Sequence, residues 1–182
     1  DDITEPAIVD DVYQITSGSE LAWLAQEVNA GRGASYNAVL CNDIDLGNEI
    51  WTPIGKFSNS AYKGTFDGQY HEVKNLKITG SASNHYGLFG VVGTGTVKNL
   101  TVSGEVSVTS GSDTYGIAAI VGCMNDGSAG TVENCINKAN VSGGKNVAGI
   151  IGYISSGYSS NKKVVQNCAN YGSISSTSNN AA

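Results

Sequence analysis

Residues 132–142 have the sequence VENCINKANVS, and 33 residues later residues 165–175 have the sequence VQNCANYGSIS. The two stretches share an initial valine, the dipeptide Asn-Cys, a second asparagine and a final β-branched residue followed by serine. In this alignment Cys135 corresponds to Cys168. Agreement at a fixed spacing indicates a chain built from a repeated structural unit.

Two short strings extend this repeat along the chain. The first, V-x-N-[L/C], contains Asn75, Asn99, Asn134 and Asn167, at intervals of 24, 35 and 33 residues. The second, G-[LI]-x-[GA], begins at Gly87, Gly116 and Gly149. Because both strings keep similar spacing, we expect corresponding residues to occupy equivalent places in successive units.

The local pattern predicts that each unit is one turn of a parallel β-solenoid. Short runs of alternating β-branched residues are bounded by Gly, Asn and Ser, which is typical of short strands. Val and Leu three positions apart cannot share one face of a straight strand, so the chain must bend at Asn, which tolerates left-handed backbone. Stacking about 4.8 Å apart would form an asparagine ladder at the corner. The expected interior column is Leu76, Leu100, Cys135 and Cys168.

One helix is predicted before the repeats, from Ser17 to Gly31. Ser17 and Glu20 have the spacing of a capping box, and Leu21 and Leu24 lie on one helical face. We expect this helix to cover the open strand edge of the first coil. No comparable segment follows Ile174, which suggests that the native protein continues past Ala182. The expected divisions are an acidic flexible tail over 1–12, capping helix and lead-in strands over 13–63, solenoid repeats over 64–176 and a flexible tail over 177–182.

Composition narrows the classes of partner. The formal charge is −6 and the isoelectric point is about 4.7, which disfavours nucleic acid and anionic membranes. Five of the 16 acidic residues lie within residues 1–11, so the remaining chain is nearly neutral. The longest apolar run, Ile117 to Val121, is far shorter than the ~20 residues of a membrane span, and we expect no membrane insertion.

No catalytic motif is convincing. Glycan-cleaving enzymes need two carboxylates across the sugar bond, and Asp43 and Asp45 are the closest pair. Hydrogen bonding at a strand end is the simpler role for both, and a turn is the simpler role for Asp67. Arg32 is the single arginine, so a basic binding site for an acidic substrate is not expected. We expect no catalytic residues, with a glycoside hydrolase or polysaccharide lyase as the less favoured alternative.

Metal and cofactor sites are not predicted either. His71 and His85 have no Cys or carboxylate at zinc-like spacing, so we expect neither a metal nor a cofactor. Calcium near the loop residues Asp113 or Asp126 stays open, although neither lies in a dense carboxylate run. Cys135 and Cys168 would stack in a geometry unfavourable to a disulfide, so free core thiols are favoured and their redox state stays open.

Tyrosines are the remaining candidates for binding. Tyr86 and Tyr115 share a repeat position, and further tyrosines gather in the last coils. Such rings can stack on sugars or anchor a protein partner, and packing within the fold is the alternative. The candidate ligand-binding set is Tyr86, Tyr115, Tyr153, Tyr158 and Tyr171.

The chain resembles a known repeat family. YGLFG at Tyr86–Gly90, with GTVKNL at Gly95–Leu100, is similar to the GLUG-motif repeat of bacterial surface proteins, including adhesin-like proteins and immunoglobulin A peptidases. The stretch from Asp43 to Gly55 is similar to the lead-in that precedes such repeats, whereas Ala118 and Ala119 depart from the motif.

That resemblance implies a right-handed parallel β-helix in an exported, non-catalytic module of a longer chain. The expected function is a structural or adhesive module of a secreted or wall-attached bacterial protein. Its partners would be a host matrix protein or a glycan, together with flanking domains of the same chain. The alternative is a carbohydrate-binding or polysaccharide-degrading β-helix domain.

Overall fold

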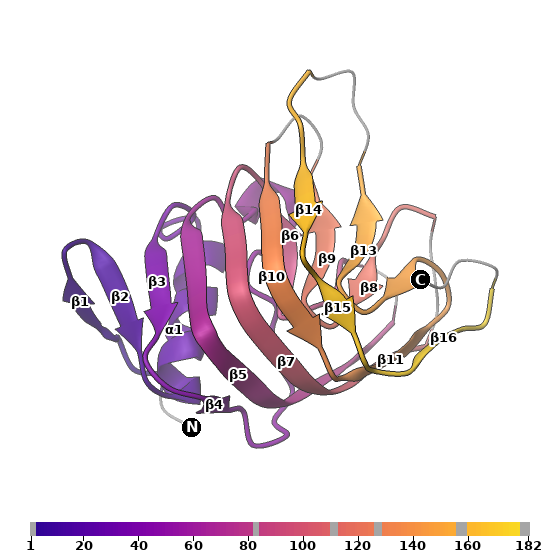
Figure 1. Ribbon diagram of the computed structural model, residues 1–182, viewed down its shortest axis with the longest axis horizontal. Helices are drawn as coiled ribbons and strands as arrows, with labels where there is room; N and C mark the ends of the chain where they lie inside the picture. The colour runs from indigo at the N-terminus through magenta and orange to yellow at the C-terminus, as the bar shows by residue number, and fades with distance from the viewer. Residues whose placement is uncertain (1–2, 82–83, 110–112, 126–128, 156–159, 179–182) are drawn as a thin grey trace.

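The computed structural model describes residues 3–81, 84–109, 113–125, 129–155 and 160–178. Its elements form one stack of parallel coils with a helix near the N-terminal end (Figure 1). In chain order they are β1 (Ala7–Val9), β2 (Val12–Ile15), α1 (Gly18–Asn29), β3 (Asn37–Leu40), β4 (Ile44–Asp45), η1 (Ser58–Ser60), β5 (Thr65–Gly80), β6 (Phe89–Val92), β7 (Thr96–Val108), β8 (Ile117–Ala118), β9 (Val121–Met124), β10 (Thr131–Asn137), β11 (Asn140–Gly143), β12 (Val147–Ala148), β13 (Ile151–Ile154), β14 (Val164–Gln166), β15 (Ala169–Asn170) and β16 (Ile174–Ser176). The prediction of an all-β solenoid with an N-terminal helix is confirmed.

The largest sheet runs along the stack in the order β1, β2, β3, β5, β7, β10 and β14 (Figure 1). Every pairing in this series is parallel except β1 with β2. A second wall contains β6, β9 and β13 in parallel. Leucine, valine, isoleucine and phenylalanine side chains fill the space between the walls, which explains the short alternating apolar runs of the sequence.

Helix α1 begins and ends where the sequence predicts. The Ser17 hydroxyl oxygen accepts a hydrogen bond from the backbone N–H of Glu20 at 3.2 Å, and the Glu20 carboxylate accepts from the Thr16 hydroxyl at 2.9 Å. The chain leaves the helix through Gly31 at a φ of 81°, a conformation that favours glycine. The buried Leu21 and Leu24 belong to the main core, so α1 closes the N-terminal end of the solenoid interior.

The segment expected to be a flexible tail over 1–12 contains a strand. In a two-residue turn Asp10 and Asp11 have φ values of 50° and 61°, and β1 pairs antiparallel with β2 through Val9 and Val12. Strands β2 and β3 already belong to the main sheet, so pairing begins well before residue 64. At the other end, Thr177 donates its backbone N–H to the Gly143 carbonyl at 3.0 Å, within the second expected tail.

The pairing register of the strands shows that the first unit of the asparagine repeat was predicted at the wrong position. Val97 pairs with Phe66, whereas Val73 pairs with Val102 and Leu76 with Gly104. Leu76 therefore lies outside the expected column, in which His71 pairs with Leu100 and Leu100 with Cys135. Cys168 follows Cys135, because the flanking residues of β10 pair in register with β14 and β15. The prediction assigned the Val73–Leu76 string to the corner that contains Asn99, whereas the string lies at the next corner of its coil. The interval of only 24 residues between Asn75 and Asn99, shorter than the other intervals, already indicated this difference.

The glycine repeat needs a similar correction. Ile117 pairs with Val147, which sets Gly116 opposite Asn146 instead of Gly149. The glycines that do align follow directly after paired residues on successive coils: they are Gly55, Gly90, Gly122 and Gly152. An added Cβ at Gly90 would lie 2.7 Å from the carbonyl oxygen of Gly55, so close backbone approach requires glycine here.

Candidate functional site

Three asparagines of the expected ladder occupy left-handed backbone positions at one corner. Asn99, Asn134 and Asn167 have φ values of 54°, 53° and 54°. The Asn134 side-chain amide donates to Asn99 Oδ1 at 3.0 Å, and the Asn99 amide donates to Asp67 Oδ1 at 3.0 Å. These side chains hydrogen-bond one coil to the next, which is a structural role.

Asn75 lies at another corner. Its side-chain amide donates to Asp45 Oδ1 at 2.8 Å, and its φ is 56°. The prediction that the chain bends at Asn75 is therefore confirmed. The prediction that Asn75 stacks on Asn99 is wrong, because the strand register places the two residues at different corners.

The carboxylates weighed for catalysis are occupied by local hydrogen bonds. Asp43 accepts from the backbone N–H of Glu72 at 2.9 Å, and this bond together with the nearby Lys74 holds the pKa of Asp43 below its usual value. Asp45 accepts from Asn75 and from the Gly47 backbone, and these bonds lower its pKa too. A general acid in glycan cleavage needs a raised pKa, so neither carboxylate has the required electrostatics.

The candidate tyrosines do not form one surface. The Tyr86 hydroxyl donates to the Ser81 carbonyl at 2.8 Å, and Tyr86 pairs with Ile117, so it does not share a repeat position with Tyr115. Tyr171 is 75% exposed and has no ring partner among the described residues. Tyr158 lies outside the described residues.

Two of these tyrosines contact a buried histidine. The sequence did not predict this contact. The ring centroids of Tyr115 and Tyr153 lie 5.3 and 6.3 Å from that of His85. His85 Nδ1 accepts the backbone N–H of Gly116 at 3.0 Å, and burial lowers the pKa of His85 to about 4. The histidine is therefore neutral near pH 7 and packs one coil against the next.

The structure shows no cluster of three or more metal-ligating side chains within the described ranges. Asp113 forms an ion pair with Lys145 at 2.6 Å, and Asp126 lies outside the described residues. All four cysteines are free, with Cys123 and Cys135 buried. No described helix is long and apolar enough to cross a membrane.

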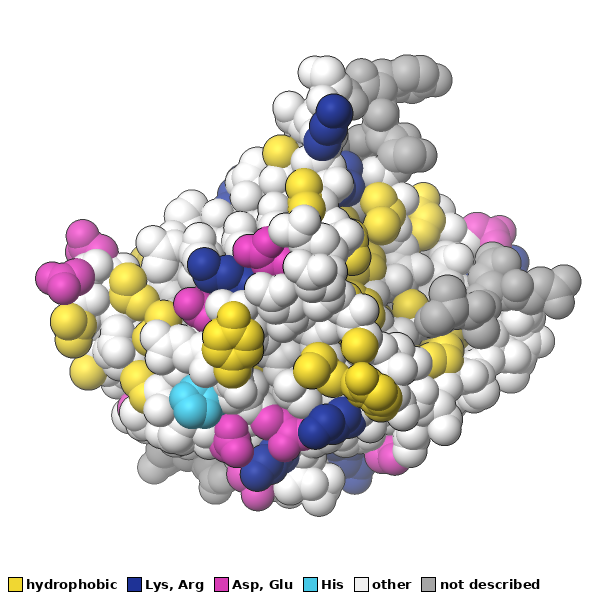
Figure 2. Space-filling model, in the orientation of Figure 1, with side chains coloured by type: hydrophobic (Ala, Val, Ile, Leu, Met, Phe, Trp, Pro, Cys, Tyr) yellow, Lys and Arg dark blue, Asp and Glu magenta, His cyan; other side chains and the backbone are white. Residues whose placement is uncertain are grey.

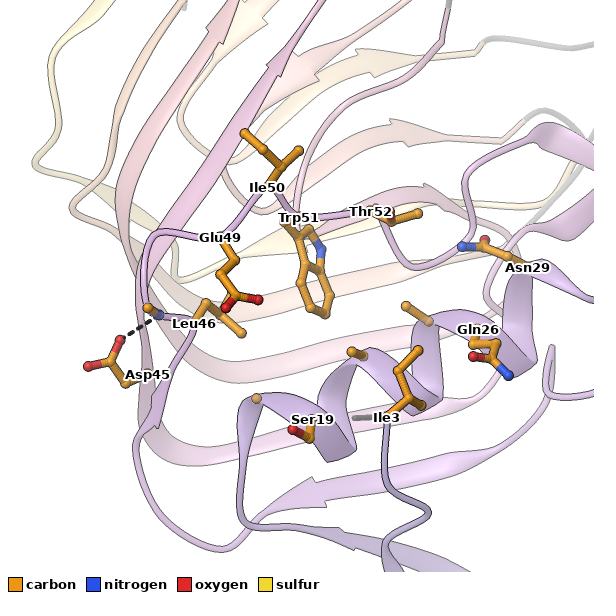
Figure 3. A pocket seen from close by; sticks show the side chains of 14 residues that line it. Ile3, Ser19, Gln26, Asn29, Asp45, Leu46, Glu49, Ile50, Trp51 and Thr52 are labelled. Carbon is orange, nitrogen blue, oxygen red and sulfur yellow. Dashed lines mark hydrogen bonds between the residues drawn. The ribbon is translucent and has the colours of Figure 1, made fainter. Parts of the chain in front are cut away.

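A groove lies between α1 and the loop that follows β4, and sequence reasoning missed it (Figure 3). Its volume is about 500 Å³, within the range of small-molecule sites. The residues lining it are Ile3, Gly18, Ser19, Ala22, Ala25, Gln26, Asn29, Asp45, Leu46, Gly47, Glu49, Ile50, Trp51 and Thr52.

The walls of the groove differ in chemistry. The indole of Trp51 and the side chain of Leu46 point toward α1, and Ile3 lies across from them at the mouth (Figure 3). The Glu49 carboxylate hangs into the space between loop and helix (Figure 3). The arrangement combines an apolar surface with hydrogen-bonding groups, which suits a ligand carrying both characters.

Comparison with known proteins agrees with a surface repeat module. No family model matches the chain. It is 30% identical over 141 residues to halomucin of Haloquadratum walsbyi, covering 73% of this chain and 1% of halomucin. It is 31% identical over 109 residues to a proposed Gly-rich membrane protein of Evansella cellulosilytica, covering 56% of this chain and 12% of that protein.

One solved structure shares the fold. The crystal structure of a proposed immunoglobulin A1 protease from Bacteroides ovatus superposes with a TM-score of 0.71 at 24% identity, over 90% of this chain and 48% of that one. The likeness concerns the fold. The chain thus spans a small part of its sequence relatives and about half of this structural neighbour.

Proposed function

We propose that the chain is a non-catalytic structural and adhesive module of a secreted or cell-surface protein. The observation that carries the proposal is the in-register stacking of coils, in which hydrogen-bonded strands and side-chain amides join each coil to the next. Such a stack is stiff along its axis and displays a long side-chain surface, which suits a spacer that also makes contacts.

Three further observations support this proposal. The name of the Evansella relative places that protein at a membrane, and the GLUG-like strings resemble those of exported bacterial proteins. The pKa values of Asp43 and Asp45 are lowered by local partners, which argues against a glycan-cleaving pair. The partners would be a glycan or a host matrix protein, with flanking domains of the same chain positioned by the stack.

Carbohydrate binding is the specific form of this function that the groove beside Trp51 favours, since glycan sites pair apolar walls with polar rims. Polysaccharide cleavage is the rival from another class, and one experiment separates the two. The purified chain is incubated with a panel of polysaccharides and with immobilised matrix proteins, and both bound protein and released reducing ends are measured.

We expect saturable binding to at least one glycan or matrix protein without release of reducing ends. Release that disappears in an Asp43→Asn, Asp45→Asn double variant would replace the adhesive function with an enzymatic one. Failure to bind every glycan and every matrix protein would overturn the adhesive part of the proposal.

A further inference from the structure

The groove lies between α1 and residues 45–52 (Figure 3). We propose that it binds one or two units of a neutral glycan, an inference that rests on the proposed adhesive function and names its site. The volume of about 500 Å³ suits a ligand of that size.

One wall of the groove is rigid and apolar. Trp51 is only 8% exposed, and its indole N–H donates to the Leu88 carbonyl at 3.0 Å. Its neighbour Ile50 is 59% exposed. The exposed part of this wall can contact the C–H face of a sugar ring at low entropic cost, because the indole behind it is already fixed.

The polar rim has spare hydrogen-bonding capacity. Among the described residues, no hydrogen bond or ion pair engages the side chains of Ser19, Gln26, Glu49 or Thr52. Asn29 differs, because its amide donates to the Pro53 carbonyl at 2.9 Å and its Oδ1 accepts from the Lys56 backbone at 2.7 Å. One hydroxyl-rich ring could therefore meet several donors and acceptors at once.

The charges of the lining select against acidic ligands. Asp45 and Glu49 line the groove, and the lining contains no lysine or arginine. An anionic sugar or a phosphate would be repelled, whereas a neutral glycan offers hydroxyl donors to the Glu49 carboxylate.

An extended peptide is less suitable, because most backbone N–H groups of the loop already have acceptors. Trp51 donates to the Lys77 carbonyl at 2.9 Å, and Leu46 donates to the Lys74 carbonyl at 2.9 Å. A peptide could not add a strand here and would depend on side-chain contacts alone.

The test is a titration of the purified chain with neutral, acidic and amino-sugar glycans, followed by isothermal titration calorimetry on the best binder. We expect a neutral glycan to bind, and the Gln26→Ala, Glu49→Gln double variant to bind it about tenfold more weakly. Glu72→Gln is the matched control, since it removes a carboxylate from the outer surface of β5 and should leave the affinity unchanged.

A second variant, Ala22→Trp, fills the groove and should abolish binding while circular dichroism shows a folded chain. Tight binding by Ala22→Trp and by the double variant would overturn the inference. So would exclusive binding of acidic glycans or of basic peptides. Binding to a matrix protein without binding to any glycan would overturn the groove assignment and leave the proposed adhesive function standing.

Discussion

Several hydrophobic residues are buried at the N-terminal end of the stack, whereas some of those in the last coil are exposed. At the N-terminal end, α1 lies over the core, and Leu21, Leu24 and Val28 are fully buried. In the last coil Val165 is 45% exposed, whereas Val132, at the same position one coil earlier, is fully buried. Burial in this fold therefore depends on the neighbouring coil or cap and is not a property of the individual coil.

The surface view agrees with this contrast. Hydrophobic side chains reach the surface between β13 and β14 (Figure 2). Within the described residues, no further strand pairs with the outer edges of β14, β15 and β16. Exposed edges of this kind attract other strands, so within residues 3–178 the region covered by α1 and the last described coil should differ in both stability and reactivity.

The largest effect is expected at the capped end. Leu24→Ala removes a fully buried side chain that joins α1 to the core, and should lower the free energy of unfolding by about 2–5 kcal/mol. Urea denaturation followed by far-ultraviolet circular dichroism measures the change. Gln26→Ala, an exposed substitution on the same helix, is the control and should change stability by less than about 0.5 kcal/mol. A loss below about 1 kcal/mol for Leu24→Ala would show that the helix is not part of the core.

The second prediction compares equivalent valines. Val132→Ala should cost about 2 kcal/mol, because it leaves a cavity in a filled core, whereas Val165→Ala should stay within about 0.5 kcal/mol. The same denaturation experiment applies to both variants. Equal losses would mean that the last coil is covered in solution.

The third prediction concerns how the free energy of unfolding depends on pH through the buried His85. Burial lowers the pKa of His85 to about 4, against about 6.5 for a free histidine. Between these values the unfolded chain binds a proton that the folded chain does not, so the His85 contribution to stability should fall as the pH drops from 6.5 toward 4 and stay constant below that. The expected fall is on the order of 1–3 kcal/mol.

Urea titrations at several pH values measure this dependence. His85→Asn keeps an acceptor for the Gly116 N–H and removes the titrating group, so its stability should be nearly flat across this window. An unchanged slope in His85→Asn would assign the effect to another group.

The smallest expected effect is a difference in the chemical reactivity of two cysteines, without a change in stability. The thiols of the buried Cys135 and the half-buried Cys168 lie on neighbouring coils and interact, which raises the pKa of Cys135 and lowers that of Cys168. Iodoacetamide at neutral pH should therefore modify Cys168 well before Cys135, as peptide mass spectrometry can show. Equal rates would contradict the exposure of the last coil.

The fold was predictable because its signals are local and repeated. The pair Val132 and Val165 set the period, and the spacing of Ser17 and Glu20 marked the beginning of α1. The register of the early coils was not predictable to the same degree, since Asn75 and Asn99 share a string and still occupy different corners. A string records a local bend, whereas the register depends on which side chains become buried against the neighbouring coil.

The candidate site was harder to predict. The groove unites one face of α1 with a loop about 25 residues further along the chain, and no spacing rule connects them. Glu49 and Ile50 gave the available signal, a charged residue and a large aliphatic residue directly before Trp51. Tyr86, by contrast, was singled out by its repeat position, yet its hydroxyl is engaged by the Ser81 carbonyl.

Hydrogen–deuterium exchange measured by mass spectrometry tests the contrast between the two ends most directly. Amides of β3, β7 and β10 lie between paired neighbours and should exchange slowly, whereas amides of β14 and β16 should exchange much faster. Slow exchange in peptides covering α1, combined with fast exchange in residues 164–176, is the predicted result. Equal protection of both regions, or faster exchange at α1 than at β14, would contradict a core covered by the helix at one end and exposed in the last described coil.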